Sequence, residues 1–367
     1  MKAKPKRILF IVPHRLHRSP GQRFRCEQYL PYLHQNGIQY TYSNIINKSD
    51  DRVFYSPGNY PGKIYIVIKA VFIRLFDVLR AHRYDAVFIY REAFMLGTVV
   101  FEHLLKWSGK PIVFDFDDAI WLNDVSEGNK NLSWLKNPSK TDHIIRHSSL
   151  VFAGNSYLAQ HARMFNPQVV VIPTTIDTNY HHPSRKIKKP DDKICIGWTG
   201  TTTTLKHFQT AIPFLLHIKE KYGQKVYFKV IVDCDFKVPE LELQSHQWKL
   251  DTEIEDLSEF DMGIMPLPND DWSKGKCGFK GLQYMSLEIP CIMSPVGVNS
   301  EIIQDGQNGF LAAADQEWIE KLSLLIENTA LRAKLGKNGR KTIEEKYSVE
   351  SQKKQYMEYF ENIMRDK

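Results

Sequence analysis

The chain has 367 residues, which exceeds the length that a single hydrophobic core usually supports, so two domains are expected. Its 43% hydrophobic and 25% charged residues are typical of a folded soluble protein. Its net charge of +7 is uneven, with 23 Lys and Arg against 14 Asp and Glu in residues 1–182 (+9) and 26 against 28 in the rest (−2). Five scattered cysteines, none at Cys-x-x-Cys spacing, exclude an evident zinc site or disulfide framework and favour a reducing, cytoplasmic compartment.

Strands and helices alternate in the first half of the chain. The apolar run Ile8–Val12 follows a basic N-terminus; it is too short for a signal-peptide core or a membrane span and predicts a buried parallel strand. Residues 24–34 have helical spacing that ends at Gly37. Further strands are expected at 86–90, 112–116, 150–153 and 169–172.

The segment 64–79 is unusually apolar for one that carries Lys69 and Arg74. It is typical of a covered core helix, or of a basic amphipathic helix that lies on a membrane surface.

The alternation stops at residues 180–192, where two prolines and a charge run indicate a linker, and it then starts again. Strands are expected at 194–198, 226–232, 262–265 and 291–293, and helices at 205–222, 281–287, 318–328, 331–346 and 349–364. The prediction is an α/β protein of two doubly wound, Rossmann-like domains that face a central cleft. The domains span 1–182 and 193–346, joined by a linker at 183–192, and residues 347–367 form a C-terminal helix that packs back on the first domain.

Two segments of the first half carry candidate chemistry. In Pro13–Arg25, Gly21 lets a ligand approach the backbone and Arg15, Arg18, Arg23 and Arg25 bring charge suited to phosphate, although a solvated basic turn has the same composition. At the end of the strand 112–116, three carboxylates follow closely: Asp115, Asp117 and Asp118. They suit metal binding, orientation of a hydroxyl or general base catalysis, or they cap a helix.

Two segments of the second half suit a diphosphate. Gly200, the threonines from Thr201 and then Lys206 follow the strand 194–198 and open a helix, an arrangement that a helix cap alone also explains. Residues 270–283 combine flexible glycines with Lys274, Lys276 and Lys280 at the start of another helix. We interpret this stretch as a phosphate-binding loop, with Gln283 offering an amide to ribose hydroxyls; the alternative is a lysine-rich surface loop.

Together, these segments resemble those of the family 4 retaining glycosyltransferases, which have the GT-B fold. The resemblance covers nearly the whole chain and is carried by residues 19–25, 90–92, 114–118, 153–157, 171–177, 196–200, 276–290 and 294–297.

The resemblance implies a role for individual positions. Gly21 is similar to the glycine near the transferred sugar, Asp117 falls where many members have a catalytic-site His, and Asp118 where they have an adjacent Asp. Lys206 matches the basic residue that neutralises the donor diphosphate, and Phe279 and Lys280 match the loop under the phosphates. Lys206 and Lys280, with Asp117 and Asp118, are the candidate catalytic residues. The expected donor-binding set is Gly21, Gly200, Thr201, Lys206, Lys276, Cys277, Gly278, Phe279, Lys280 and Gln283. The expected acceptor-side set is Gln22, Arg23, Arg25, Arg91 and Glu92.

Gln283 matches the second glutamate of the family's E-x7-E motif, whereas the first glutamate has no clear counterpart. The arginine that usually precedes the family's lysine is also missing, with Gly200 and Thr201 near its place, and Lys276 or Lys280 is expected to supply that charge.

The implied reaction moves a sugar from a UDP- or GDP-sugar to a glycan, a lipid-linked or another hydroxyl acceptor with retention, in the synthesis of cell-surface polysaccharide or glycoconjugates. No metal and no further cofactor is expected. The basic first domain suggests peripheral contact with the inner face of the membrane, and nucleic-acid binding is not expected, because the basic residues are not interleaved with aromatic ones. The alternatives are a non-catalytic GT-B partner subunit that binds nucleotide or glycan, and a nucleotide-sugar epimerase.

Overall fold

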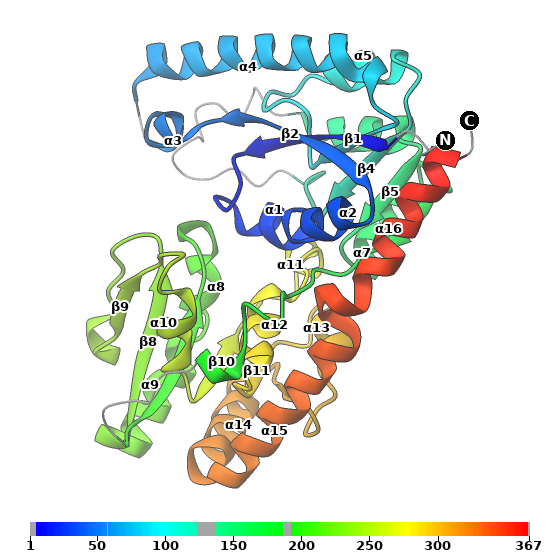
Figure 1. Cartoon of the computed structure of the whole chain (residues 1–367). Coiled ribbons are helices and arrows are strands. Elements are labelled where there is room, and N and C mark those ends of the chain that lie inside the picture. Colours follow the sequence, from blue (N-terminus) through cyan, green and yellow to red (C-terminus); the bar gives the residue numbers. More distant parts are fainter. Residues whose placement is uncertain (1–4, 57, 123–136, 186–191, 366–367) are drawn as a thin grey trace. The chain divides into compact units, whose positions relative to one another are not determined.

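The computed structural model describes residues 5–56, 58–122, 137–185 and 192–365. The chain divides into two compact units: unit 1 comprises Met1–Thr174 and Lys353–Lys367, and unit 2 comprises Thr175–Gln352. Each unit holds a six-stranded sheet in which every pairing is parallel. The two Rossmann-like folds predicted from the alternation are therefore confirmed (Figure 1). The predicted linker lies largely in 186–191, outside the described residues.

The sheet of unit 1 has the order β2-β1-β3-β4-β5-β6. Its strands are β1 (Lys6–His14), β2 (Ile38–Ile46), β3 (Ala86–Tyr90), β4 (Ile112–Phe116), β5 (Leu150–Ala153) and β6 (Val169–Val171). The central strands β3, β4 and β5 are buried along their whole length, as expected for apolar runs covered on both faces. Strand β2 was not predicted. It lies at the edge and mixes polar with apolar residues, so no continuous apolar run marks it.

The helices of unit 1 are α1 (Pro20–Arg25), α2 (Leu30–Gln35), α3 (Lys48–Tyr55), α4 (Tyr60–Arg80), α5 (Val100–Trp107), α6 (Lys140–His147), α7 (Ser156–Arg163) and α16 (Val349–Arg365). The predicted helix 24–34 is thus interrupted by the short 3-10 turn Glu27–Tyr29. The last helix, α16, begins at the end of unit 2 and belongs to unit 1 from Lys353 onward. Its Phe360 ring lies 6.3 Å from Phe10, 6.1 Å from Phe88 and 5.8 Å from Phe152, all strand residues of the sheet.

The sheet of unit 2 has the order β12-β11-β10-β7-β8-β9. Its strands are β7 (Ile194–Thr199), β8 (Val226–Val232), β9 (Gln244–Gln247), β10 (Met262–Met265), β11 (Cys291–Met293) and β12 (Phe310–Leu311). The short edge strands β9 and β12 were not predicted, whereas the four inner strands were and are confirmed.

The helices of unit 2 are α8 (Leu205–Gln209), α9 (Ile212–Tyr222), α10 (Glu253–Ser258), α11 (Asp271–Lys274), α12 (Phe279–Ser286), α13 (Asn299–Ile302), α14 (Asp315–Glu327) and α15 (Thr329–Thr342). The single helix predicted at 205–222 is in fact two. Pro213 lies in the first turn of α9, where its missing N–H costs nothing, so a new helix begins there.

Candidate functional site

The predicted phosphate-binding segment of unit 2 joins two helices. Asp270 caps α11 by accepting a hydrogen bond from the Ser273 N–H at 2.7 Å, and Gly278 is the N-cap of α12. Gly278 has φ +69°, and a Cβ placed there would lie 2.3 Å from the Ile302 Cδ1, so only glycine suits the position. Because Gly278 has no side chain to cap the helix, the first N–H groups of α12 form a turn suited to an anion.

Three lysines that the sequence placed in two separate segments lie near one buried imidazole. They are Lys206, Lys276 and Lys280, and the charge of each acts on His207, which is 3% exposed on α8, while Asp270 opposes them. Burial, together with the positive charges of these lysines, lowers the pKa of His207 from 6.5 to about 4. His207 was not among the predicted residues, since a lone histidine in a helix gives no signal of the charges around it. The fold thus concentrates positive charge beside a neutral histidine.

Each lysine also has a defined setting. The Lys280 Nζ lies 5.4 Å from the ring centroid of Trp198, and the Lys276 Nζ lies 4.8 Å from that of Trp272. Cys277, between them in the chain, is buried, and its thiol lies 3.9 Å from the Gly275 carbonyl oxygen. Lys206 is exposed.

The threonine-rich loop after β7 forms hydrogen bonds within itself and with the end of β8 and the residue that follows it. The Thr201 N–H donates to the Thr204 Oγ1 at 3.0 Å, and both the N–H and the hydroxyl of Thr202 donate to the Asp233 Oδ1 at 2.7 Å. The Gly200 N–H donates to the Ile231 carbonyl at 3.0 Å. These bonds hold the loop in shape, and the lysines carry the charge at this end of the sheet.

Gln283, the predicted ribose-binding residue, is 3% exposed and bonds a carboxylate that the sequence did not single out. Its Nε2 donates to the Oε1 of Glu253, on α10, at 3.3 Å. Glu253 is 4% exposed and also accepts from the Trp248 Nε1 at 3.3 Å. Because the amide nitrogen donates to Glu253, the amide oxygen is the atom that could accept from a ligand hydroxyl. Glu253 also places a carboxylate directly behind Gln283, which itself carries no charge.

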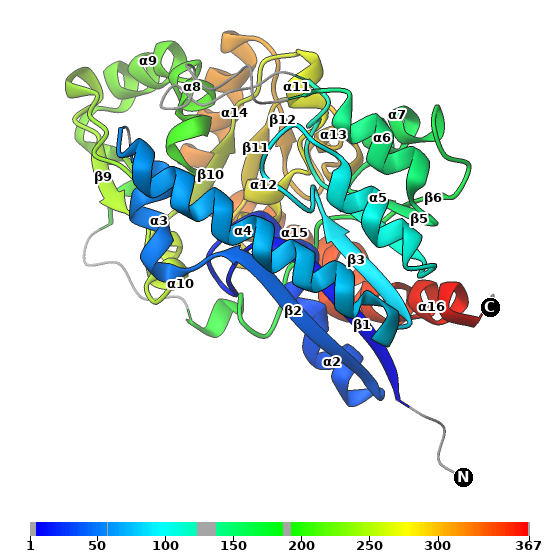
Figure 2. The same cartoon turned by 90° about the horizontal axis from the view of Figure 1, so that it is seen from above.

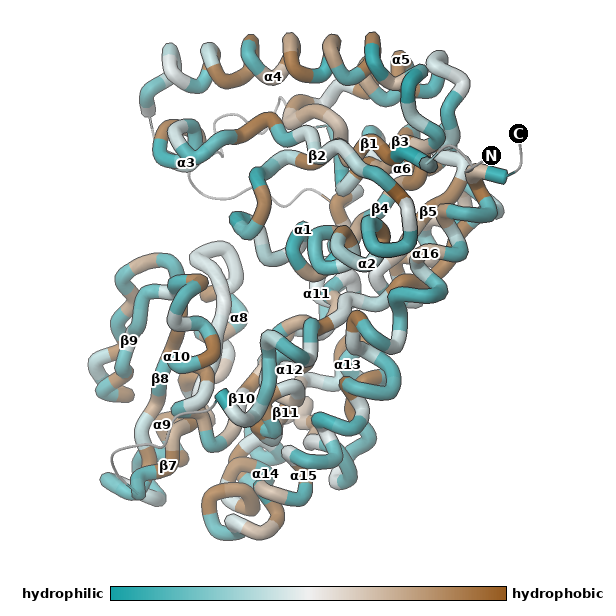
Figure 3. Tube along the Cα trace, in the orientation of Figure 1, coloured by the Kyte–Doolittle hydropathy of each residue, from teal (hydrophilic) through white to brown (hydrophobic). Residues whose placement is uncertain are grey.

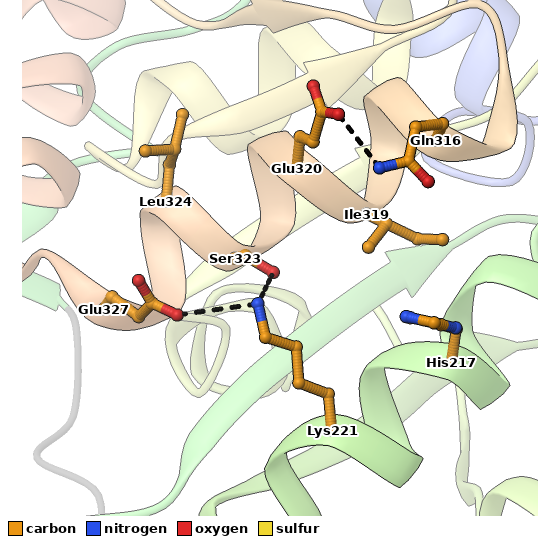
Figure 4. A pocket seen from close by; sticks show the side chains of 8 residues that line it. All are labelled: His217, Lys221, Gln316, Ile319, Glu320, Ser323, Leu324 and Glu327. Carbon is orange, nitrogen blue, oxygen red and sulfur yellow. Dashed lines mark hydrogen bonds and ion pairs between the residues drawn. The ribbon is translucent and has the colours of Figure 1, made fainter.

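The described residues of unit 2 line hollows at two different places. One of about 290 Å³ follows the carboxyl ends of β10 and β11, where Pro266–Asn269 and Ser294–Val296 line it, directly before the segment that begins at Asp270. The other, of about 520 Å³, lies between α9 and α14, where Lys221 donates to the Ser323 hydroxyl at 3.1 Å (Figure 4). None of the predicted site residues lines either hollow; the first agrees with the carboxyl-end rule for parallel sheets because it lies at the ends of two strands.

In unit 1 the structure brings Gly21, Asp117, Asp118 and Arg91 together at the carboxyl ends of β3 and β4. The Asp117 Oδ1 accepts from the Tyr90 hydroxyl at 2.9 Å and from the Arg91 Nε at 2.8 Å, and Arg91 also pairs with Asp118. A Cβ on Gly21 would lie 2.1 Å from the Tyr90 hydroxyl and 3.1 Å from the Asp117 Oδ2, so glycine is needed for this close approach. Arg91 has φ +60°, an unfavourable value for arginine, and such strain is concentrated at functional sites.

Other residues predicted on the acceptor side lie inside unit 1. Arg25 is 1% exposed and forms a two-bond pair with the equally buried Asp115, at 2.5 and 3.1 Å. Gln22 is fully buried and links β1 to its neighbours, its amide bonding both the N–H and the carbonyl of His14. The structure therefore gives Arg25 and Gln22 partners within the domain. Their charge and polarity in sequence carried no sign of this, since Asp115 is 90 residues from Arg25.

The remaining acceptor-side candidates are nearer the surface. Arg23 is half-buried on α1, with its guanidinium carbon 4.7 Å from the ring centroid of Phe24. Glu92 is 40% exposed and pairs with the Lys140 Nζ at 3.0 Å.

Within the described ranges, no group of three or more His, Cys, Asp or Glu side chains is arranged to hold a metal ion. Asp117 and Asp118 instead share the Arg91 guanidinium. The metal-free reaction implied by the resemblance remains a prediction.

The pKa of His207 can be measured and reports the positive charge that the three lysines place near its imidazole. Because the folded-state pKa lies below that of the unfolded chain, the neutral imidazole favours the fold above pH 6.5, and this contribution is lost as the pH falls from 6.5 towards 4. We expect the Lys280→Ala substitution to raise the His207 pKa, since it removes one repelling charge, and a bound nucleoside diphosphate to raise it as well. NMR titration of the imidazole measures both, with His207→Gln to assign the signal. A His207 pKa near 6.5 in the unsubstituted protein would contradict the cluster.

Part of the chain matches a known family. A family model described as glycosyl transferases group 1 matches residues 273–342, which include the predicted phosphate-binding stretch from Lys276 to Gln283. A search of curated proteins gave no match.

Solved structures match nearly the full chain. A glycosyltransferase from Rickettsia africae is 14% identical with a TM-score of 0.70, covering 99% of this chain and 100% of that one. A sucrose-phosphate synthase from Thermosynechococcus elongatus is 12% identical with a TM-score of 0.70, over 99% and 100%. HepE from Anabaena, in complex with UDP and glucose, is 16% identical with a TM-score of 0.66, over 98% and 100%. These likenesses show a shared fold, the GT-B fold.

Proposed function

We propose that this chain, a nucleotide-sugar-dependent glycosyltransferase with a group 1 domain on a GT-B fold, transfers a sugar with retention of configuration. The acceptor is a hydroxyl group of a glycan or of a lipid-linked molecule. The observation that carries the proposal is the convergence of Lys206, Lys276 and Lys280 around His207, beside the glycine-capped start of α12. This is a site for the diphosphate of a donor.

On the donor side, Lys206 and Lys280 neutralise the charge that develops on the leaving diphosphate, which is the main demand of the reaction. Lys276 and the α12 N–H groups of Phe279 and Lys280 add to this field. Gln283, held by Glu253, accepts a hydrogen bond from a ribose hydroxyl. The complexes of HepE with UDP and with UDP-glucose support a UDP-sugar as the first donor to test, with a GDP-sugar next.

On the acceptor side, Asp117 and Asp118 are the proposed catalytic carboxylates. Arg91 fixes both, and Gly21 lets Asp117 and the Tyr90 hydroxyl that bonds it lie close to the backbone of α1. Arg23 and Glu92 are the acceptor-side residues nearest the surface. Arg25 and Gln22 act by holding α1 and β1 in place.

In the reaction, the donor's own phosphate helps to deprotonate the acceptor hydroxyl on the face that the leaving group departs from, so no protein nucleophile is required. We propose that this occurs without a metal, in the cytoplasm at the inner face of the membrane, in the synthesis of cell-surface polysaccharide or glycoconjugates. No disulfide joins any of the five cysteines, all of which lie in the described part of the chain.

A thermal-shift screen with UDP-, GDP- and ADP-sugars tests donor binding. A donor at about 100 times its Kd stabilises the fold by about 2.7 kcal/mol, so one nucleotide series is expected to raise the melting temperature by several degrees and the others not. The best donor is then incubated with the purified chain and glycan or lipid-linked acceptors, and NMR of the product reads the anomeric configuration.

The same incubation separates the alternatives. Transfer with retention supports the proposal, and donor hydrolysis alone still shows an active site. Conversion of the donor sugar without an acceptor indicates an epimerase. A chain that binds no nucleotide-sugar contradicts the proposal.

A further inference from the structure

The longest helix of unit 1 turns a large apolar surface to solvent. On α4, six large apolar or aromatic side chains are each more than half exposed, and those after Ile64 recur every three or four residues: Ile64, Tyr65, Ile68, Phe72, Phe76 and Leu79. We call this set the apolar face of α4. Leu75 lies among them and is 41% exposed. At this spacing the side chains share one side of the helix, and brown turns recur along α4 in Figure 3.

The opposite side of α4 is buried and partly polar, the reverse of an ordinary surface helix. Its buried residues are Ile66, Ala70, Arg74 and Asp77. Figure 2 shows α4 lying lengthwise over the sheet, and it packs on β2.

Buried hydrogen bonds fix this orientation. The fully buried Arg74 donates to the Val12 carbonyl at 2.8 Å and to Asp77 at 2.7 Å, and it also bonds the Ser43 carbonyl at 3.2 Å. A rotation of α4 that buried the apolar face would pull Arg74 from these partners and leave charge unpaired, at a high cost. The apolar face is therefore held outward.

The exposed charged side chains of α3, which packs against α4, and of the turn that follows α4 are positive. From residue 47 to residue 83, the exposed charged side chains of the described structure are Lys48, Arg52, His82 and Arg83, with His82 cationic only when protonated. The acidic residues of this stretch are buried or paired: Asp50 with Lys69, Asp51 with Arg15, and Asp77 with Arg74 and Arg80. A surface of bare apolar side chains with a cationic border is complementary to an anionic lipid bilayer.

A neighbouring helix also exposes a large aromatic side chain. Helix α5 packs against α4, and its Trp107 is 79% exposed. Tryptophan is enriched where a protein meets lipid headgroups. No helix among the described residues is long and apolar enough to cross a membrane.

We infer that the apolar face of α4 is a membrane-docking surface, which inserts Ile68, Phe72 and Phe76 between the headgroups of an anionic phospholipid bilayer while Arg83 and its basic neighbours contact lipid phosphates. The inference goes beyond sugar transfer and does not depend on it, since binding is measured without donor or acceptor. A second copy of this chain is the other occupant to be tested.

Co-sedimentation of the full chain with vesicles tests it, using phosphatidylcholine alone and phosphatidylcholine mixed with phosphatidylglycerol. We expect binding to the anionic vesicles that falls with added salt and is much weaker without phosphatidylglycerol. Phe72→Glu should lower the partition coefficient at least about tenfold, since it places a charge in the inserted face. Met164→Glu, at an equally exposed apolar residue (67% for both) at the end of α7, should change it little.

Circular dichroism and the melting temperature confirm that both variants fold, and Phe72→Ser replaces Phe72→Glu if that variant does not. Sedimentation velocity of the free protein completes the test. Absence of binding to anionic vesicles overturns the inference. So does a dimer that Phe72→Glu dissociates while vesicle binding is absent, because the face then belongs to a second copy.

Discussion

Replacing Lys280 or Lys206 by alanine is expected to lower kcat/KM by about 10²- to 10³-fold, the usual effect of removing one group that stabilises charge in the transition state. Both lysines lie near His207, and Lys280 is additionally placed by the start of α12. The loss should be in kcat more than in KM, because the diphosphate gains charge as the sugar leaves. Steady-state kinetics with the donor selected by thermal shift measures it.

Lys274→Ala is the matched control. Lys274 belongs to the same segment, but it is paired with Asp271 at 3.0 Å and is not among the main causes of the lowered pKa of His207. We expect its kinetics to change less than about threefold. Unchanged turnover in both Lys206→Ala and Lys280→Ala would remove these residues from the mechanism, and an equal loss in all three variants would indicate a general charge effect.

The substitution Arg25→Ala is expected to destabilise unit 1 by about 3–5 kcal/mol, because it leaves the Asp115 carboxylate buried without its cation. Asp115 is fully buried, and burial raises its pKa to about 6 while Arg25 opposes the rise. Without Arg25 the pKa should rise further, and the variant should be more stable at pH 5 than at pH 8 because protonation removes the buried charge. Thermal unfolding at the two pH values measures both effects.

Two further variants interpret the result. The double substitution Arg25→Leu with Asp115→Leu should recover much of the lost stability, since no charge is then left buried. Arg23→Ala, on the half-buried side of the same helix, should change the melting temperature little. An Arg25→Ala variant with normal stability and a raised KM for the acceptor would contradict this prediction. It would instead support the acceptor-binding role that the sequence suggested for Arg25.

The sequence indicates the role of the lysines more directly than it indicates the role of Arg25. Lys276 and Lys280 stand beside glycines at the start of a helix, so local chemistry indicates an anion site, and the matched family model covers that stretch. Arg25 looked similar, a basic residue near a glycine. Its partner Asp115 is 90 residues away, and only the packing of α1 over β4 brings the two together.

The sequence by itself determined the two parallel sheets, their inner strands and most helices, because buried strands and amphipathic helices each leave a periodic pattern. It missed β2, an edge strand with polar residues, and it joined α8 to α9 across Pro213. It also left two interpretations of the segment 64–79 open.

Only the tertiary structure decided which way α4 faces, that Glu253 stands behind Gln283, and that Lys206 meets Lys280 near His207. The physical reason is common to the three. Periodicity and turn chemistry are local, whereas the environment of a buried charge is set by residues distant in the chain, since a charge must find its partners wherever the fold brings them. For α4 the buried Arg74 decided the orientation, so its apolar residues face outward.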